Sequence, residues 1–285
     1  MTDALGHGTT GTAGFGRTAR SGGVDVTPQD DSAQPGLDVG VPTPAPRDVP
    51  RSVVFRHLVQ VQGRIVGLYW VIVVVAFALI GAAYAFFSRN VELSVWDWAT
   101  QSPKYFLLAM GTILTAAYLP VFVAHGVTRR TFALMATVWV LLVTVSAGVI
   151  MALGYLVEGF VYDAAGWPQA LTSPHLYDSA GESVLIFTEF ALLTLGHMVT
   201  GWLIGTGYYR WGWWWGTAFM VPALLPAVVV ELALSTSWIG ELIETVFDYS
   251  PPPLGFGVMI SLCGAAAGLV ATFTLVRTTP LRSKV

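Results

Sequence analysis

Charged residues are scarce in this chain. Asp, Glu, Lys and Arg together make up 11% of its 285 residues, whereas 54% are hydrophobic, and the mean hydropathy is +0.65. A soluble domain carries about 25% charged residues, so the composition predicts an integral membrane protein with little soluble mass. The formal net charge is -3 and no basic cluster is present, so we expect no nucleic-acid binding.

Cysteine and enzyme motifs are also nearly absent. The single cysteine, Cys263, cannot form an intramolecular disulfide or, alone, a metal site, and we interpret it as a small buried hydrophobic residue. The chain has no HExxH, no GxSxG and no phosphate-binding GxxxxGKS/T motif. We therefore predict no catalytic residue, no metal and no cofactor on this chain. Any use of ATP must take place on another polypeptide.

The first fifty residues lack large apolar side chains. Residues 1–50 are rich in Gly, Thr, Pro, Asp and Ala, a composition that cannot bury enough surface to offset the chain entropy. They contain no apolar core followed by a cleavage site, so they do not resemble a signal peptide. We predict a disordered cytoplasmic tail over residues 1–50 and a transmembrane domain over residues 51–285.

Long apolar stretches dominate the rest of the chain. A helix needs about 20 apolar residues to cross the roughly 30 Å hydrocarbon core, where its backbone must satisfy its own hydrogen bonds. Six stretches are long enough, and we predict an all-α integral membrane protein with six transmembrane helices. These stretches are Val66–Phe87, Tyr105–Val123, Phe132–Val157, Val184–Thr206, Trp213–Leu234 and Phe256–Val276.

Basic residues are distributed unevenly around these stretches. If the chain starts in the cytoplasm and alternates, only Arg89 and Lys104 fall outside. This bias follows the positive-inside rule, so we predict a multi-pass protein of the cell membrane with both termini in the cytoplasm. The basic residues on the inner side are Arg51, Arg56, Arg64, Arg129, Arg130, Arg210, Arg277, Arg282 and Lys284.

Two further segments have amphipathic helical patterns. Ser52–Val66 carries basic residues on its polar face, which predicts an N-terminal elbow helix in the inner headgroup plane, bent from the first span at Gly63 or Gly67. A plain extension of the first span is the alternative. Ser237–Asp248 has apolar residues on one face and acids on the other. It is too short to span, so we predict a short outer helix before the last span.

Two ionisable residues lie inside the fourth stretch. Glu189 is about two turns from its outer end, and His197 follows eight residues later, roughly 12 Å along the helix, so the two cannot share a metal ion. A charge in the hydrocarbon core is costly, and we predict that both residues face a substrate path. Packed side chains without such a role are the alternative. Glu158 and Glu231 lie near outer span ends, where we expect solvated boundary residues.

Small residues and prolines predict where helices pack and bend. Glycines four residues apart in the fourth and sixth stretches allow close approach of helix backbones, either within the chain or between copies. Pro222 and Pro226 remove backbone donors on one face of the fifth stretch and should kink it. The glycine pairs are Gly201 with Gly205 and Gly264 with Gly268.

A short cytoplasmic turn carries the clearest family resemblance. The sequence from His125 to Thr131 is similar to the Gly-x-Thr-Arg-Arg turn of small bacterial permease-like proteins. Together with six spans, internal termini, an elbow helix and a short outer helix, it makes the chain resemble the permease subunits of type-2 ATP-binding-cassette exporters. The resemblance covers about Arg51 to Lys284. The chain departs from it in lacking a very large outer domain, and its long loop is Glu158–Glu182.

The resemblance implies a function and partners. The chain would pair as a homodimer or heterodimer and export a hydrophobic or amphipathic substrate. A separate cytosolic ATP-binding-cassette ATPase would bind ATP and dock on the turn through Gly126, Thr128, Arg129 and Arg130. The two arginines could instead serve only the positive-inside rule.

The sequence is also compatible with two other functions. A non-transporting accessory or immunity protein could have the same fold. An ion-coupled carrier should show internal repeats and several buried ionisable groups. We find no repeat, and only Glu189 is clearly placed as a buried charge.

Overall fold

The computed structural model describes residues 49–88, 91–236, 242 and 245–280. The predicted tail, residues 1–50, lies almost wholly outside the described residues. So does most of the helix predicted over Ser237–Asp248, of which residues 245–247 are helical.

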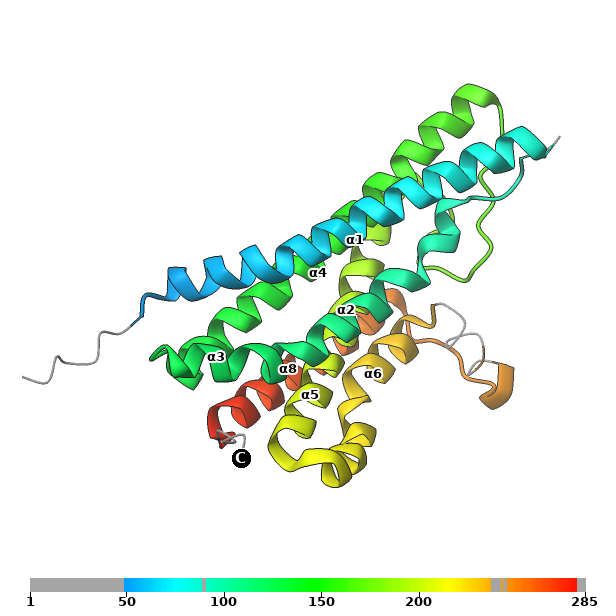
Figure 1. Cartoon of the computed structure of the whole chain (residues 1–285). Coiled ribbons are helices and arrows are strands. Elements are labelled where there is room, and N and C mark those ends of the chain that lie inside the picture. Colours follow the sequence, from blue (N-terminus) through cyan, green and yellow to red (C-terminus); the bar gives the residue numbers. More distant parts are fainter. Residues whose placement is uncertain (1–48, 89–90, 237–241, 243–244, 281–285) are drawn as a thin grey trace, which may run out of the picture. The chain divides into compact units, whose positions relative to one another are not determined.

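The described residues are almost entirely helical and contain no β-strand, only an isolated bridge between Leu93 and Ala170 (Figure 1). A 3-10 turn, η1, precedes α2, and a π-helical segment, η2, joins α2 to α3. The elements are α1 (Arg51–Phe87), η1 (Trp96–Ala99), α2 (Gln101–Ile113), η2 (Leu114–Tyr118), α3 (Leu119–Ala124), α4 (Arg129–Ala165), α5 (Ser183–Ala223), α6 (Leu225–Leu234) and α8 (Leu254–Thr278).

Five helical segments are long and apolar enough to cross a membrane, which fits the predicted all-α, multi-pass membrane protein. The fourth and fifth apolar stretches both fall within one of these segments, so the count of six is not reproduced. The segments are Arg51–Phe87, Trp96–Ala124, Arg129–Ala165, Ser183–Leu234 and Leu254–Thr278.

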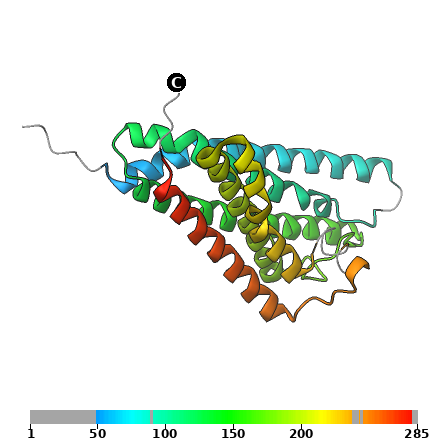
Figure 2. The ribbon, with the colours of Figure 1, turned by 90° about the horizontal axis from the view of Figure 1, so that it is seen from below.

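The segment Ser183–Leu234 folds back on itself at one glycine. Gly212 has φ 78° and ψ -166°, a conformation outside the helical region that glycine adopts without steric cost. Residues before Gly212 contact residues after it, and pairs farther from Gly212 along the sequence also meet. The Tyr208 hydroxyl lies 3.0 Å from that of Thr217, and the Ala227 amide donates to the Thr200 hydroxyl over 3.0 Å. The segment is therefore an antiparallel helical hairpin (Figure 2).

The second arm of this hairpin, in which the two prolines predict a kink, has a break between two helices. Helix α5 ends at Ala223, and α6 begins at Leu225 with Pro226 in its first turn. Proline lacks the amide proton that a continuous helix needs, which accounts for the break.

Helix α1 is continuous through Gly63 and Gly67, so a separate elbow helix is not confirmed. Its buried residues recur every four positions from Val54 to Val66, on one face. The polar residue Gln62 also lies on that buried face. Its side chain accepts a hydrogen bond from the Trp139 indole over 2.5 Å and donates to the Met110 carbonyl over 3.4 Å. A buried amide thus ties α1 to α4 and α2.

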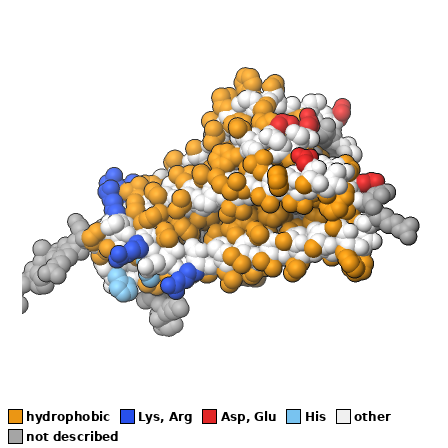
Figure 3. Space-filling model, turned by 90° about the horizontal axis from the view of Figure 1, so that it is seen from above, with side chains coloured by type: hydrophobic (Ala, Val, Ile, Leu, Met, Phe, Trp, Pro, Cys, Tyr) orange, Lys and Arg blue, Asp and Glu red, His pale blue; other side chains and the backbone are white. Residues whose placement is uncertain are grey.

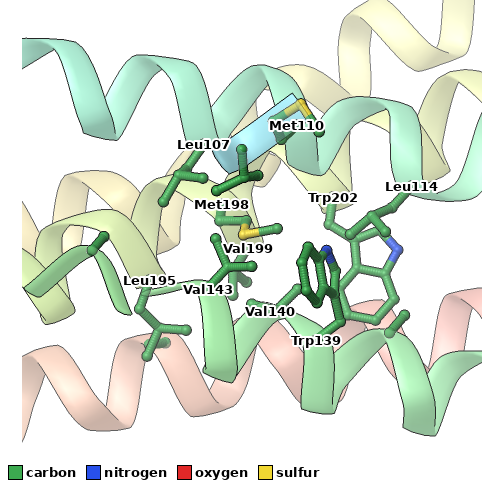
Figure 4. Packing of buried hydrophobic residues seen from close by; sticks show 14 of the residues in the cluster. Leu107, Met110, Leu114, Trp139, Val140, Val143, Leu195, Met198, Val199 and Trp202 are labelled. Carbon is green, nitrogen blue, oxygen red and sulfur yellow. The ribbon is translucent and has the colours of Figure 1, made fainter. Parts of the chain in front are cut away.

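The core forms where α2, α4 and α5 meet, and large side chains from all three interlock there (Figure 4). The helices approach closely because glycine lies at the α2–α5 contact. A Cβ atom on Gly201 would lie 1.9 Å from the Leu108 carbonyl oxygen, and one on Gly205 would lie 1.9 Å from that of Thr112. Gly111 of α2 faces α5 in the same way.

The second glycine pair also lies at contacts within the chain. A Cβ atom on Gly264 would lie 2.7 Å from Val229, and one on Gly268 would lie 2.6 Å from Val199. Both pairs therefore serve packing inside this chain. Cys263, beside the second pair, is exposed rather than buried, because it lies on the outward face of α8.

Replacing Gly205 with Ala is expected to lower the free energy of unfolding by about 1–3 kcal/mol, because the added methyl group forces α2 and α5 apart. Gly67→Ala on α1 is the matched control. No atom lies within 4 Å of its added Cβ, and relief from glycine's entropy cost should raise stability by roughly 0.5–1 kcal/mol. Unfolding in mixed micelles measures both. Equal stability of the two variants would contradict the close contact.

Candidate functional site

A buried aspartate begins the first cluster of ionisable groups. Asp97 lies in η1 with 1% of its surface exposed, and its amide donates to the Ser94 hydroxyl over 3.2 Å. One carboxylate oxygen accepts a hydrogen bond from the Tyr155 hydroxyl of α4 over 2.8 Å. The other accepts from the Thr172 amide over 2.7 Å and from the Thr172 hydroxyl. Asp97 thus binds the loop between α4 and α5, residues 166–182, to the helices.

His175 of the same loop bridges two carboxylates. Its Nε2 lies 2.6 Å from Asp97 Oδ1, and its Nδ1 lies 2.8 Å from Glu189 Oε1. The second oxygen of Glu189 accepts from the Leu176 amide over 2.7 Å. The imidazole ring stacks on Tyr177 with the ring centroids 4.6 Å apart. We call Asp97, His175 and Glu189 the His175 cluster.

The two carboxylates set the charge of His175. Burial alone lowers the pKa of the imidazole, but hydrogen bonds and attraction from Asp97 and Glu189 outweigh it and raise the pKa to about 9. The ring is therefore an imidazolium at neutral pH, donating one proton to each carboxylate. The buried Tyr177 beside it stays a neutral phenol, because burial and the charge of Glu189 both raise its pKa.

A second buried cluster joins three helices. Lys104 of α2 lies 2.6 Å from Glu231 of α6, and the two side chains expose only 2% and 1% of their surface. His197 of α5 contributes Nε2, 3.5 Å from the same carboxylate oxygen. Its Nδ1 lies 2.8 Å from the Leu193 carbonyl oxygen, which can only accept, so Nδ1 carries a proton. We call Lys104, His197 and Glu231 the Lys104 cluster.

The predicted substrate-path residues are therefore both buried, but they belong to different clusters. Glu189 contacts the α4–α5 loop, whereas His197 contacts Lys104's partner Glu231. A substrate-path role for either residue stays a prediction. The expectation that Glu231 is a solvated boundary residue is wrong, because its carboxylate is buried in an ion pair with Lys104. Glu158 is half-buried and accepts three hydrogen bonds.

Sequence reasoning missed Asp97, Lys104 and His175 as members of these clusters. A signal for one pair was available, since Lys104 and Glu231 have opposite charges near the same end of two apolar stretches. Asp97 and His175 lie in connecting segments where charges are ordinary, so nothing local marked them. Within the described ranges, no group of His, Cys, Asp and Glu residues is placed to hold a metal ion.

The turn between α3 and α4 is built locally. Gly126 has φ 83°, a left-handed conformation that reverses the chain. The Thr128 hydroxyl accepts from the Thr131 amide over 3.2 Å and caps α4. Gly126, Thr128 and Arg130 are exposed, and Arg129 is half-buried.

Charge is segregated between the two ends of the helices. The ring centroids of His57 and Phe122 are 5.4 Å apart, so the start of α1 lies beside the end of α3 and the α3–α4 turn. Figure 3 shows Lys and Arg side chains at one end of the described residues and Asp and Glu at the other. We call these the basic end and the acidic end. Helix α4 begins at the basic turn and ends at Ala165, so the α4–α5 loop, which contains Asp178 and Glu182, follows the opposite end of this helix.

Comparisons of the chain with protein-family models, with curated proteins and with solved structures found no match. The features of the chain that bear on its function are therefore the buried clusters, the basic turn and the distribution of charge.

Proposed function

We propose that the chain crosses the cell membrane six times, with both termini in the cytoplasm. The hairpin at Gly212 supports this count, because it reverses the chain within Ser183–Leu234 and turns one long segment into two passes. The segregation of basic and acidic side chains supports the orientation through the positive-inside rule. An even number of crossings brings both termini to the basic end.

Cysteine labelling tests this topology. In a Cys263→Ala background, Asp178→Cys at the acidic end should react with a membrane-impermeant thiol reagent applied to intact cells. Thr131→Cys at the basic end should react only after the membrane is permeabilised. Labelling of Thr131→Cys in intact cells would reverse the orientation, and labelling of both positions would show mixed insertion.

We propose further that the chain is the membrane subunit of an ATP-driven exporter. The observation that carries this is the α3–α4 turn, which is short, capped and basic and is exposed at Gly126, Thr128 and Arg130. Such a turn offers Arg129 and Arg130 for charge-assisted hydrogen bonds to carboxylates of a cytosolic ATPase. ATP binds to that partner. Two such subunits, identical or related, would enclose the path between them.

The cargo proposed for this exporter is hydrophobic or amphipathic. The described helices present mainly aliphatic and aromatic side chains, and the buried ionisable groups are engaged with one another. A small hydrophilic ion would need more polar groups along its way.

Replacing Arg129 and Arg130 with Gln tests the docking site. Loss of hydrogen bonds from charged groups should weaken ATPase copurification about tenfold, while membrane insertion is unchanged. Arg51→Gln with Arg56→Gln is the matched control, since it removes the same charge from the basic end outside the turn. Unchanged copurification of the turn variant would leave Arg129 and Arg130 with the topological role alone.

One observation favours a second candidate, a proton-coupled carrier. Such carriers depend on buried ionisable groups, and the His175 and Lys104 clusters together supply six. Transport in vesicles separates the candidates. An exporter stops when ATP is removed, whereas a carrier stops when the proton gradient is collapsed. Absence of transport when both ATP and a proton gradient are supplied would favour the accessory or immunity protein.

A further inference from the structure

An apolar groove of about 610 Å³ lies between α1, η1 and α4, toward the acidic end. Helix α1 lines it with small residues, Ala78, Gly81 and Ala85, at helical spacing, so the two helices leave space between them. Trp96 closes the floor. A Cβ atom on Gly154 of α4 would lie 2.1 Å from the Trp96 indole, so the ring packs directly against this glycine. The indole Nε1 donates a hydrogen bond to the Met151 carbonyl over 3.2 Å. The floor of the groove is therefore held in place by both packing and a hydrogen bond.

A carboxylate lies in the wall of this otherwise apolar groove. Glu158 of α4 accepts hydrogen bonds from Ser94 Oγ at 2.5 Å, from the Trp96 amide at 2.8 Å and from Gln169 Nε2 at 2.7 Å. All three donors are neutral. In the part of the chain that the structure describes, no Lys, Arg or His forms an ion pair with Glu158. The groove thus combines apolar walls with one carboxyl group that three neutral donors hold in place.

We propose that this groove binds a single-chain cationic amphiphile, with its alkyl chain along α1 and its ammonium group beside Glu158. The volume lies within the roughly 300–1,000 Å³ of small-molecule pockets. The carboxylate complements a cation and repels an anionic headgroup, and the aromatic rings of Trp96 and Trp167 also favour a cation. A cationic amphiphile would be a cargo of the proposed exporter, and the inference rests on that proposed function for the location of the groove in the membrane. Binding itself requires no ATPase, so it can be measured on the chain alone.

Photolabelling of the purified chain in nanodiscs of zwitterionic lipid tests the proposal. The probe is a dodecylammonium with a diazirine on its chain, and mass spectrometry identifies the labelled peptides. We expect labels on α1 and α4 residues of the groove. Dodecyltrimethylammonium should compete at about tenfold lower concentration than dodecanol, since the charged contact is available only to the cation. Dodecyl sulfate should compete least.

Two variants locate the site. Gly81→Leu fills the groove without a backbone clash, because the nearest atom to its Cβ is 3.9 Å away. It should reduce groove labelling at least about fivefold. Gly67→Leu on the same helix, with nothing within 4 Å of its Cβ, is the matched control and should label normally. Glu158→Gln should abolish the preference for the cation. If that variant does not fold, the competitor series still tests the preference for a cation, and Gly81→Leu still tests the location of the site.

Other outcomes overturn the proposal. Equal competition by cation, alcohol and sulfate would show an apolar lipid groove only. Labelling that Gly81→Leu leaves intact would place the amphiphile elsewhere. Protection of the groove that grows with protein concentration would identify a second copy of the chain as its occupant. The docking site and the groove fail separately: unchanged ATPase copurification of the variant with Arg129 and Arg130 replaced by Gln would reject the docking site, whereas the groove is rejected only by the labelling results above.

Discussion

Replacing Lys104 with Met is expected to lower the free energy of unfolding by about 3–5 kcal/mol, because a buried carboxylate loses its cation. Glu231 exposes 1% of its side chain, so water cannot take the place of the ammonium group. Removing one partner of a buried ion pair costs far more than removing both. Unfolding in mixed micelles and the yield of monodisperse protein measure the loss.

The double variant Lys104→Met with Glu231→Gln is the decisive companion. It removes both charges at nearly constant volume, so most of the lost stability should return. Arg56→Met, which removes an exposed basic residue from α1, controls for the change in composition and should have little effect. A double variant no more stable than Lys104→Met would show that the two charges do not stabilise each other.

The Lys104–Glu231 pair also shows where sequence reasoning stopped. Hydropathy is a local property, so each predicted apolar stretch lies inside one of the long helical segments. The ion pair joins residues 127 positions apart, and no local pattern indicates which charges meet. Burial of Glu231 depends on that partner, and a position near a span end therefore predicted the wrong environment.

The positions at which helices continue or bend are a second feature that the sequence does not predict well. Periodicity predicts that Ser52–Val66 is helical, and the structure agrees, but it does not determine whether the helix bends away from the next span. At Gly212 the opposite problem arises, because the reversal takes one residue inside a segment of otherwise helical character. Glycine spacing was more informative. It indicated close contact at Gly201 and Gly205, although the partner helix, α2, emerged only from the structure.

Replacing His175 with Phe is expected to release the α4–α5 loop from the helices. The phenyl ring keeps the stacking on Tyr177, but both N–H donors and the positive charge disappear. Asp97 and Glu189, each within 3 Å of the imidazole, are then two buried carboxylates that repel each other. We expect a loss of about 3–5 kcal/mol at neutral pH and faster proteolysis of the loop. His125→Phe, at the exposed basic turn, is the control.

The pH dependence identifies the charge of His175 as the cause. Its pKa of about 9 in the folded protein lies above its ordinary value of 6.5, so the folded state binds the proton more tightly. The stabilisation is therefore complete below about pH 6.5, declines between pH 6.5 and 9, and is lost above pH 9. Over this window the free energy of unfolding of the wild-type protein should fall by on the order of 3 kcal/mol, because each pH unit between the two pKa values corresponds to about 1.4 kcal/mol. His175→Phe should lack this slope, and His125→Phe should retain it. A slope that persists in His175→Phe would assign the titration to another group and leave the loop held by packing alone.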